Sequence, residues 1–239
     1  MNKAASISAA VLFALALSGC AATDPSGQND PYEATNRDIF AMNQKLDHAV
    51  ARPVAVFYNH AFPPVVRDGV HNVLTNLNSP VVFANDLLQG ETTRAGQTLG
   101  RAVVNSTLGL GGLVDLAAKI GIPGHTEDFG LTLGVWGANE GPYLMLPFAG
   151  PSNPRDLVGI GGDIAMDPFT WISFHNSTLW SGIRAGMGVI DVRARNVDNL
   201  DQIERTSVDL YATTRSLYRQ HRNAEIRKGA PDTENLPNL

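Results

Sequence analysis

The stretch NRDIFAMNQKLDHAVARP, residues 36–53, decides the fold class of this chain. Polar residues such as Asn43 and Lys45 lie between apolar ones, and the apolar ones recur every three or four residues. That spacing places them on one face of a helix; they are Ile39, Phe40, Met42, Leu46, Ala49 and Val50. The pattern predicts an amphipathic helix, which we expect Pro53 to end because proline lacks the backbone N–H of a helix interior.

Similar spacing predicts further helices along the chain. They cover residues 65–77, 80–88, 91–104 and 197–218. Gly96 and Gly100 weaken the third of these, since glycine is a poor helix former, or they let a neighbouring helix approach closely. Strand-like alternation is scarce, so the predicted fold class is mainly α.

The middle of the chain differs from both ends. Glycines are dense between residues 105 and 162, which favours bends and tight backbone approaches over uniform helix. Residues 108–112, LGLGG, superficially resemble a nucleotide-binding loop. They lack its third glycine and its strand–helix surroundings, so we interpret them as a bend.

No enzyme motif stands out. A Gly-x-Ser-x-Gly elbow is absent, and the six histidines are scattered without a partner cysteine, so neither a catalytic serine nor a metal site is predicted. The acids of His125-Thr126-Glu127-Asp128 could bind a cation or belong to a solvated loop. With 18 basic against 23 acidic residues, the chain offers no reason to expect nucleic acid as a partner.

The N-terminus has the form of a lipoprotein export signal. A basic start is followed by an apolar run over residues 7–17 that is too short to span a bilayer. The run ends in Leu-Ser-Gly-Cys at residues 17–20, the pattern cleaved before a lipid-modified cysteine. An ordinary secretory signal with a chance cysteine is the alternative. Cys20 is the only cysteine in the chain, and acylation would use its thiol.

The residue after Cys20 is Ala21, whereas aspartate there favours retention in the inner membrane, so we expect an outer-membrane location. The predicted organisation is a signal peptide over 1–19, a flexible tether over 20–30, a folded domain over 31–225 and a disordered tail over 226–239.

Aromatic residues cluster near position 175. Trp171, Phe174 and Trp180 lie among serine, histidine and asparagine. Core packing would explain them, and so would anchoring at a membrane interface, where indole rings are favoured.

Taken together, five motifs resemble the MlaA/VacJ family of outer-membrane lipoproteins over residues 29 to 225. They are NDPYExxNR (29–37), RPVA (52–55), NSTLGxGGLxD (105–115), EDFGxTLG (127–134) and GPYLxLPF (141–148), the last followed by RD (155–156). Their order and spacing carry the resemblance, because no single motif would suffice.

The resemblance implies a ring of amphipathic helices around a central pore, embedded in the periplasmic leaflet of the outer membrane beside a trimeric porin. Members of the family take mislocalised glycerophospholipids from the outer leaflet through this pore and pass them to a soluble periplasmic carrier protein. The implied function is transport and not catalysis, without a cofactor, and it maintains lipid asymmetry. The competing hypotheses are a scaffolding or virulence-associated envelope lipoprotein and a tethered lipid hydrolase.

The resemblance also implies site residues. A mobile, glycine-rich hairpin near the pore would correspond to the segment that Leu108 opens and that Gly134, Gly137 and Gly141 close as hinges or gate. Asn43, on the polar side of the first helix, is a candidate for the pore lining or occupies a surface position.

Overall fold

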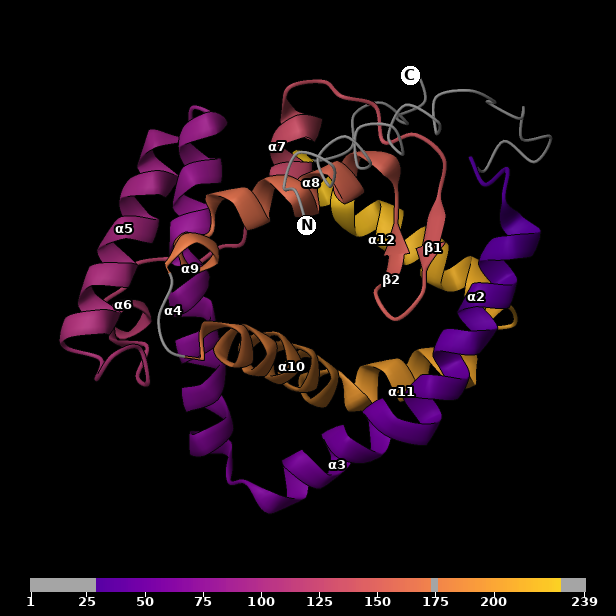
Figure 1. Cartoon of the computed structure of the whole chain (residues 1–239), viewed down its shortest axis with the longest axis horizontal. Helices are drawn as coiled ribbons and strands as arrows, with labels where there is room; N and C mark the ends of the chain where they lie inside the picture. Colours follow the sequence, from indigo (N-terminus) through magenta and orange to yellow (C-terminus); the bar gives the residue numbers. More distant parts are fainter. Residues whose placement is uncertain (1–28, 173–175, 229–239) are drawn as a thin grey trace, which may run out of the picture.

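The computed structural model describes residues 29–172 and 176–228, and these are mostly helical (Figure 1). The elements are α2 (Glu33–Leu46), the π-helix η1 (Asp47–Ala51), α3 (Arg52–Ala61), α4 (Pro64–Leu88), α5 (Thr92–Thr107), α6 (Leu116–Lys119), α7 (Phe129–Val135), β1 (Leu144–Leu146), β2 (Gly150–Ser152), α8 (Pro154–Met166), α9 (Pro168–Trp171), α10 (Ser177–Arg195), α11 (Val197–Thr206) and α12 (Leu210–Ile226). The mainly α fold class is confirmed.

These elements follow one another around a ring (Figure 1). α2, η1 and α3 form one side, and α4 forms the next. α7 and α8 pack on α4, α12 packs on α7 and β2, and β1 returns to α2. α10 crosses from α4 to α3, while α5 packs on α4 outside the ring. The ring of helices expected from the family resemblance is therefore present.

Three helix boundaries differ from the sequence-based expectation. Pro53 does not end the first helix, because η1 carries the chain into α3 and Pro53 lies in the first turn of α3, where a missing N–H costs little. Pro80 lies inside α4, which unites the two helices predicted there. The helix predicted over 197–218 is instead divided, because Asp209 has an extended backbone and caps α12 by accepting the Ala212 N–H at 3.1 Å.

The glycine-rich hairpin expected between Leu108 and Gly141 is not found. That segment contains α6 and α7, joined by residues without regular secondary structure. The two-stranded hairpin lies after it, with Leu144 opposite Ser152 and Leu146 opposite Gly150. The glycines of the segment instead serve the turns that follow α5, α6 and α7, where Gly111, Gly121 and Gly137 have positive φ.

The ring has no single hydrophobic core in its described part. One apolar cluster joins α3 to α10 around Tyr58 and Ala194. A second joins α2, β1 and α12 around Tyr143 and Tyr211. Ion pairs connect other segments that are distant in sequence, with Nη2 of Arg52 2.6 Å from the Asp201 carboxylate. In a ring, each contact between neighbouring segments is stabilised separately. Polar contacts therefore hold some of these segments together, whereas a single hydrophobic core does so in a globular domain.

The folded part begins before residue 31, the boundary expected from sequence. Asp30, assigned there to the tether, is buried, and its carboxylate accepts hydrogen bonds from Asn36 at 2.8 Å and from Arg215 at 2.5 Å. At the other end, Lys228 forms an ion pair with Glu91 at 2.5 Å. The predicted signal peptide and Cys20 lie outside the described residues, as do Phe174 and residues 229–239.

Candidate functional site

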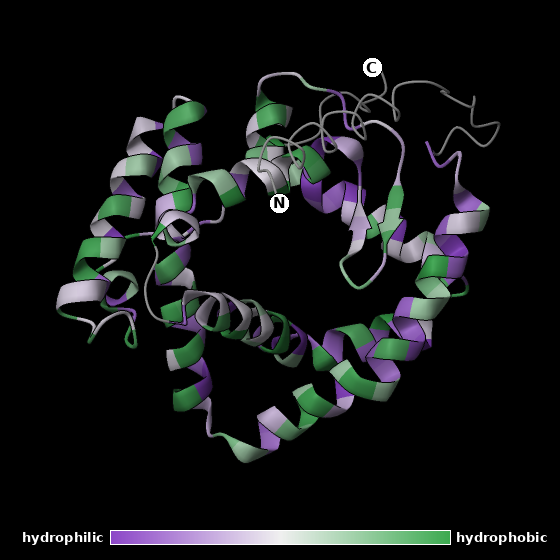
Figure 2. Ribbon diagram, in the orientation of Figure 1, coloured by the Kyte–Doolittle hydropathy of each residue, from purple (hydrophilic) through white to green (hydrophobic). Residues whose placement is uncertain are grey.

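Large apolar side chains are exposed on helices all around the ring. Val65 is 82% exposed, and Phe57 and Trp171 are each 71% exposed. Figure 2 shows apolar residues distributed over every side of the ring instead of gathered in one interior. In water so much exposed apolar surface would be costly, and extensive exposed apolar surface marks contact with lipid or another protein. No helix among the described residues combines the length and the apolar character needed to cross a membrane.

Buried side chains have the opposite character. Among the residues that the structure describes, the buried polar and charged side chains outnumber the buried apolar ones. Asp86, fully buried, lies 2.9 Å from Nε2 of His125 and accepts a hydrogen bond from Thr98 at 2.8 Å. Polar contacts inside and apolar side chains outside are the distribution expected of a protein surrounded by acyl chains.

Two asparagines of α2 hold the β1–β2 hairpin. The Asn36 amide donates to the Tyr143 carbonyl at 3.0 Å and accepts the Met145 N–H at 2.9 Å. One heptad later, the Asn43 amide donates to the Leu146 carbonyl at 2.8 Å and accepts the Phe148 N–H at 2.9 Å. Each amide thereby replaces a neighbouring strand along one edge of β1. Asn43, considered as a pore-lining or surface residue, fixes the hairpin with both of its polar groups.

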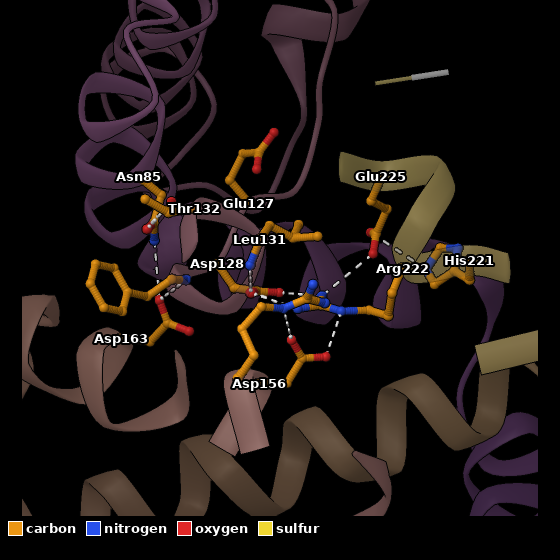
Figure 3. Close-up of polar contacts among 12 residues, drawn as sticks. Asn85, Glu127, Asp128, Leu131, Thr132, Asp156, Asp163, His221, Arg222 and Glu225 are labelled. Carbon is orange, nitrogen blue, oxygen red and sulfur yellow. Dashed lines mark hydrogen bonds and ion pairs between the residues drawn. The ribbon is translucent and has the colours of Figure 1, made fainter. Parts of the chain in front are cut away.

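A polar cluster joins α12 to α7 and α8 (Figure 3). Arg222 donates two hydrogen bonds to the Asp128 carboxylate, at 2.6 and 2.9 Å, and its Nε lies 2.8 Å from Asp156. Asp128 also caps α7 by accepting the Leu131 N–H at 2.8 Å. Although burial opposes ionisation, hydrogen bonds from Arg222 and Tyr218 hold the pKa of Asp156 below its usual value. The cluster fixes this side of the ring.

Asp163 lies beside this cluster, and in the described part of the chain no basic side chain forms an ion pair with its carboxylate. Its carboxylate accepts the Phe129 N–H at 2.9 Å and the Asn85 amide at 3.1 Å, and Asn85 in turn accepts the Thr132 hydroxyl (Figure 3). Burial disfavours the charged form and raises the pKa of Asp163 to about 6, and the nearby Asp128 charge adds to this. Asp163 therefore binds a proton more readily in the folded than in the unfolded protein.

Asp163→Asn is expected to stabilise the protein above pH 6. Stability from the raised pKa is present below pH 4 and is lost as the pH rises through 6, whereas asparagine keeps both acceptor contacts and carries no charge. We expect a gain of about 2 kcal/mol at pH 8 that shrinks toward pH 4. Thermal unfolding in detergent micelles at several pH values measures this gain. A stability difference between Asp163→Asn and wild type that does not vary with pH would contradict the raised pKa of Asp163.

The four residues expected to form a hinge or gate have structural roles in the ring. Leu108 ends α5 and is exposed. A Cβ on Gly134 would lie 2.6 Å from Ile226. Gly137, at φ +89°, ends α7, with its N–H donating to Gly134 at 2.9 Å. The Gly141 carbonyl accepts a hydrogen bond from Asn29 at 2.6 Å. Their motion stays a prediction.

The two described tryptophans expected as membrane anchors are both on the surface. Trp180 is 58% exposed, and the exposed Trp171 donates its indole N–H to the Ala165 carbonyl at 2.9 Å. Core packing is therefore the wrong explanation for these two residues, and anchoring at a membrane interface remains a prediction.

The two acids of residues 125–128 both pair with arginines of the protein, Glu127 in a buried position and Asp128 in a half-buried one. Glu127 accepts hydrogen bonds from Arg94 at 2.7 Å and from Gln89 at 2.8 Å, and Asp128 holds Arg222. Neither the cation site nor the solvated loop considered for them describes this arrangement. No cluster of potential metal ligands is found in the described part of the chain.

Sequence reasoning assigned Asn43 to this site but missed three other residues, Asn36, Phe148 and Asp163. Asn36 and Asn43 lie seven residues apart, on one helix face, and that spacing was a usable signal. Phe148, in the turn of the hairpin, stood in the GPYLxLPF motif without an assigned role. Asp163 had no sequence signal, because its burial depends on how α7 lies on α8.

Comparison with known proteins agrees with these features. A family model described as "MlaA lipoprotein" matches residues 28–225. The Escherichia coli K12 protein named "Intermembrane phospholipid transport system lipoprotein MlaA" is 35% identical, over 97% of this chain and 93% of its own. The protein of that name from Haemophilus influenzae is 33% identical, and the alignment covers 98% of this chain and 96% of the Haemophilus protein. A solved structure from work on "maintenance of bacterial outer membrane lipid asymmetry" superposes with a TM-score of 0.74 and 31% identity, over 82% of this chain and 98% of that one.

Proposed function

Because the chain belongs to the MlaA lipoprotein family, we propose that it removes mislocalised glycerophospholipids from the outer leaflet of the outer membrane through a pore in its ring. It passes them to a soluble periplasmic carrier protein, and a trimeric porin lies beside it. Similar proteins are named as phospholipid transport lipoproteins, which agrees with a role in transport instead of catalysis.

The observation that carries the proposal is the distribution of polarity around the ring. Apolar side chains such as Phe57 and Val65 are exposed to the surroundings, while charged groups join the helices to one another. A ring of this kind is stable within one leaflet without a spanning helix. A lipid that passes through it needs polar groups for its headgroup, because an unsatisfied buried charge costs several kcal/mol or more.

Deletion of the gene, followed by complementation, tests the proposed transport. We expect phospholipid in the outer leaflet, measured by headgroup labelling of intact cells, to rise on deletion and to return to normal with the wild-type chain. Normal asymmetry together with loss of a porin complex would instead support the scaffolding hypothesis. Ester hydrolysis by the purified protein would support the hydrolase.

Cys20→Ala tests the proposed lipid anchor. We expect the variant to lose most of its outer-membrane fraction without unfolding, since the acyl chains retain the ring and do not pack inside it. Sucrose-gradient fractionation measures the location, and circular dichroism of the purified variant checks the fold. A variant that fractionated wholly with the outer membrane and functioned normally would make the anchor secondary to the embedded ring.

A further inference from the structure

The turn of the β1–β2 hairpin extends toward the interior of the ring. In the view down the short axis, the turn between the two strands lies inside the circle of helices and is directed toward α10 and α11 (Figure 1). The turn consists of Pro147, Phe148 and Ala149, which are all exposed. In this view the turn stands clear of the helices that surround it.

Phe148 has an unusual combination of backbone and side chain. Its φ is +65°, in the left-handed region, and its side chain is 79% exposed. That backbone conformation costs a residue with a Cβ about 1–2 kcal/mol, and bulky residues rarely adopt it. Gly150, the first residue of β2, follows this turn and has a φ of +83°. The chain thus has glycine at one left-handed position and an exposed aromatic ring at the other, and strain of this kind is concentrated at functional sites.

Asn43 maintains this conformation. Its amide accepts the Phe148 N–H at 2.9 Å and donates to the Leu146 carbonyl at 2.8 Å, so it holds the backbone on both sides of Pro147. Directly after β2, Asn153 donates to the Tyr218 hydroxyl of α12 at 3.0 Å. The base of the hairpin is thereby fixed to α2 and to α12, and the backbone position of Phe148 is set before any ligand arrives.

The turn suits an acyl chain and not a headgroup. Its side chains are apolar, and two of its backbone donors are already used, since the Phe148 N–H is donated to Asn43 and the Ala149 N–H to the Pro147 carbonyl at 2.8 Å. A phosphate therefore finds no free N–H on these two residues. An aromatic face instead gains by removing acyl methylenes from water.

We propose that Phe148 contacts the acyl chains of the phospholipid during its passage through the ring, and that Asn43 positions it. This inference rests on the proposed transport function and adds the residue that touches the lipid. Phe148 is then a selectivity residue for apolar cargo, and Asn43 acts only through it.

Two substitutions at position 148 separate the contact from the turn. Phe148→Asn keeps a residue that tolerates the left-handed conformation but removes the apolar surface, whereas Phe148→Leu keeps the apolar surface. In the deletion strain we expect Phe148→Asn to clear outer-leaflet phospholipid about tenfold more slowly, which corresponds to about 1.4 kcal/mol. Phe148→Leu is expected to stay close to wild type. Val208→Ala, which shortens a fully exposed side chain between α11 and α12, is the matched control.

A double substitution tests whether Asn43 acts through Phe148. If Asn43 only positions the Phe148 side chain, Asn43→Ala should slow clearance by itself but add no further loss to Phe148→Asn. A structural role alone would give losses that add. Immunoblots of the membrane fraction are used to compare variants at equal protein levels.

Photocrosslinking gives a readout that is independent of cell growth. Benzoylphenylalanine at position 148 of the purified full chain, in vesicles of phosphatidylethanolamine and phosphatidylglycerol, should form a lipid adduct that Asn43→Ala reduces. A benzoylphenylalanine at position 57 on α3 is the comparison, and its adduct should not respond to Asn43→Ala.

The inference is overturned if Phe148→Asn, at normal abundance, clears phospholipid as fast as wild type. It is also overturned if position 148 gives no adduct while position 57 does, or an adduct that Asn43→Ala leaves unchanged. Failure of the proposed transport is distinguishable from these outcomes, because deletion of the whole chain would then leave lipid asymmetry unaltered.

Discussion

Asp30→Ala is expected to destabilise the protein by about 3–5 kcal/mol, the cost of leaving one member of a buried ion pair without its partner. The Asp30 side chain is fully buried, and Arg215 beside it is 7% exposed. The same carboxylate accepts hydrogen bonds from Asn36 and from the Tyr211 hydroxyl. Its removal leaves Arg215 with only the more distant Glu33, at 3.7 Å, and takes one hydrogen-bond acceptor from Asn36 and from Tyr211 at the junction of α2 and α12.

A surface ion pair provides the control for this substitution. Asp68 lies 3.0 Å from Arg195 and is 61% exposed, and Arg195 retains Asp191 as a second partner. Asp68→Ala should therefore cost no more than about 0.5 kcal/mol. Chemical unfolding of both purified variants in detergent, followed by circular dichroism, measures the two free energies. Equal losses would show that burial does not control the strength of the Asp30 interaction.

Gly159→Ala is expected to destabilise the protein by about 3 kcal/mol, because a new methyl group would meet backbone that cannot move aside. A Cβ at position 159 would lie 2.5 Å from the Gly130 nitrogen and 2.7 Å from its Cα. These two glycines allow α8 to cross α7 at close range. The substitution separates the helices that carry Asp163 and Asp128.

Gly161→Ala, two residues along the same helix, should have the opposite sign. No atom lies within 4 Å of a Cβ built there, so alanine meets no obstacle and helix propensity alone favours it by up to about 1 kcal/mol. Melting temperatures of the two variants and the wild type test the pair. If both substitutions destabilised the protein equally, loss of helix flexibility and not close packing would explain Gly159.

Local patterns predicted which segments are helical better than where the helices end. The apolar spacing of residues 36–53 predicted the first helix, and η1 then continued it past Pro53. Likewise, α4 runs through Pro80, which was expected to begin a new helix. Proline removes one backbone hydrogen bond of the helix. Packing of the flanking segments compensates for that loss, and a short stretch of sequence does not show this packing.

The candidate site depended still more on contacts between distant residues. Asn43 was selected as a polar residue of the first helix, but its hydrogen-bond partners lie more than 100 positions away in the hairpin. The glycine-rich segment from Leu108 to Gly141 was expected to form a mobile hairpin of its own. Glycine is also used to end helices, as at Gly137, and to bring them together, as at Gly159.

The sequence alone determined the mainly α class and the family, because helix periodicity and the order of short motifs are properties of local stretches. Tertiary structure decided that the helices close into a ring and that Asn36 and Asn43 serve as partners for a strand. It also decided that Asp163 lies half-buried against the Phe129 N–H and the Asn85 amide. These features arise only where segments far apart in the chain meet, because burial and pairing depend on neighbours that no local window includes.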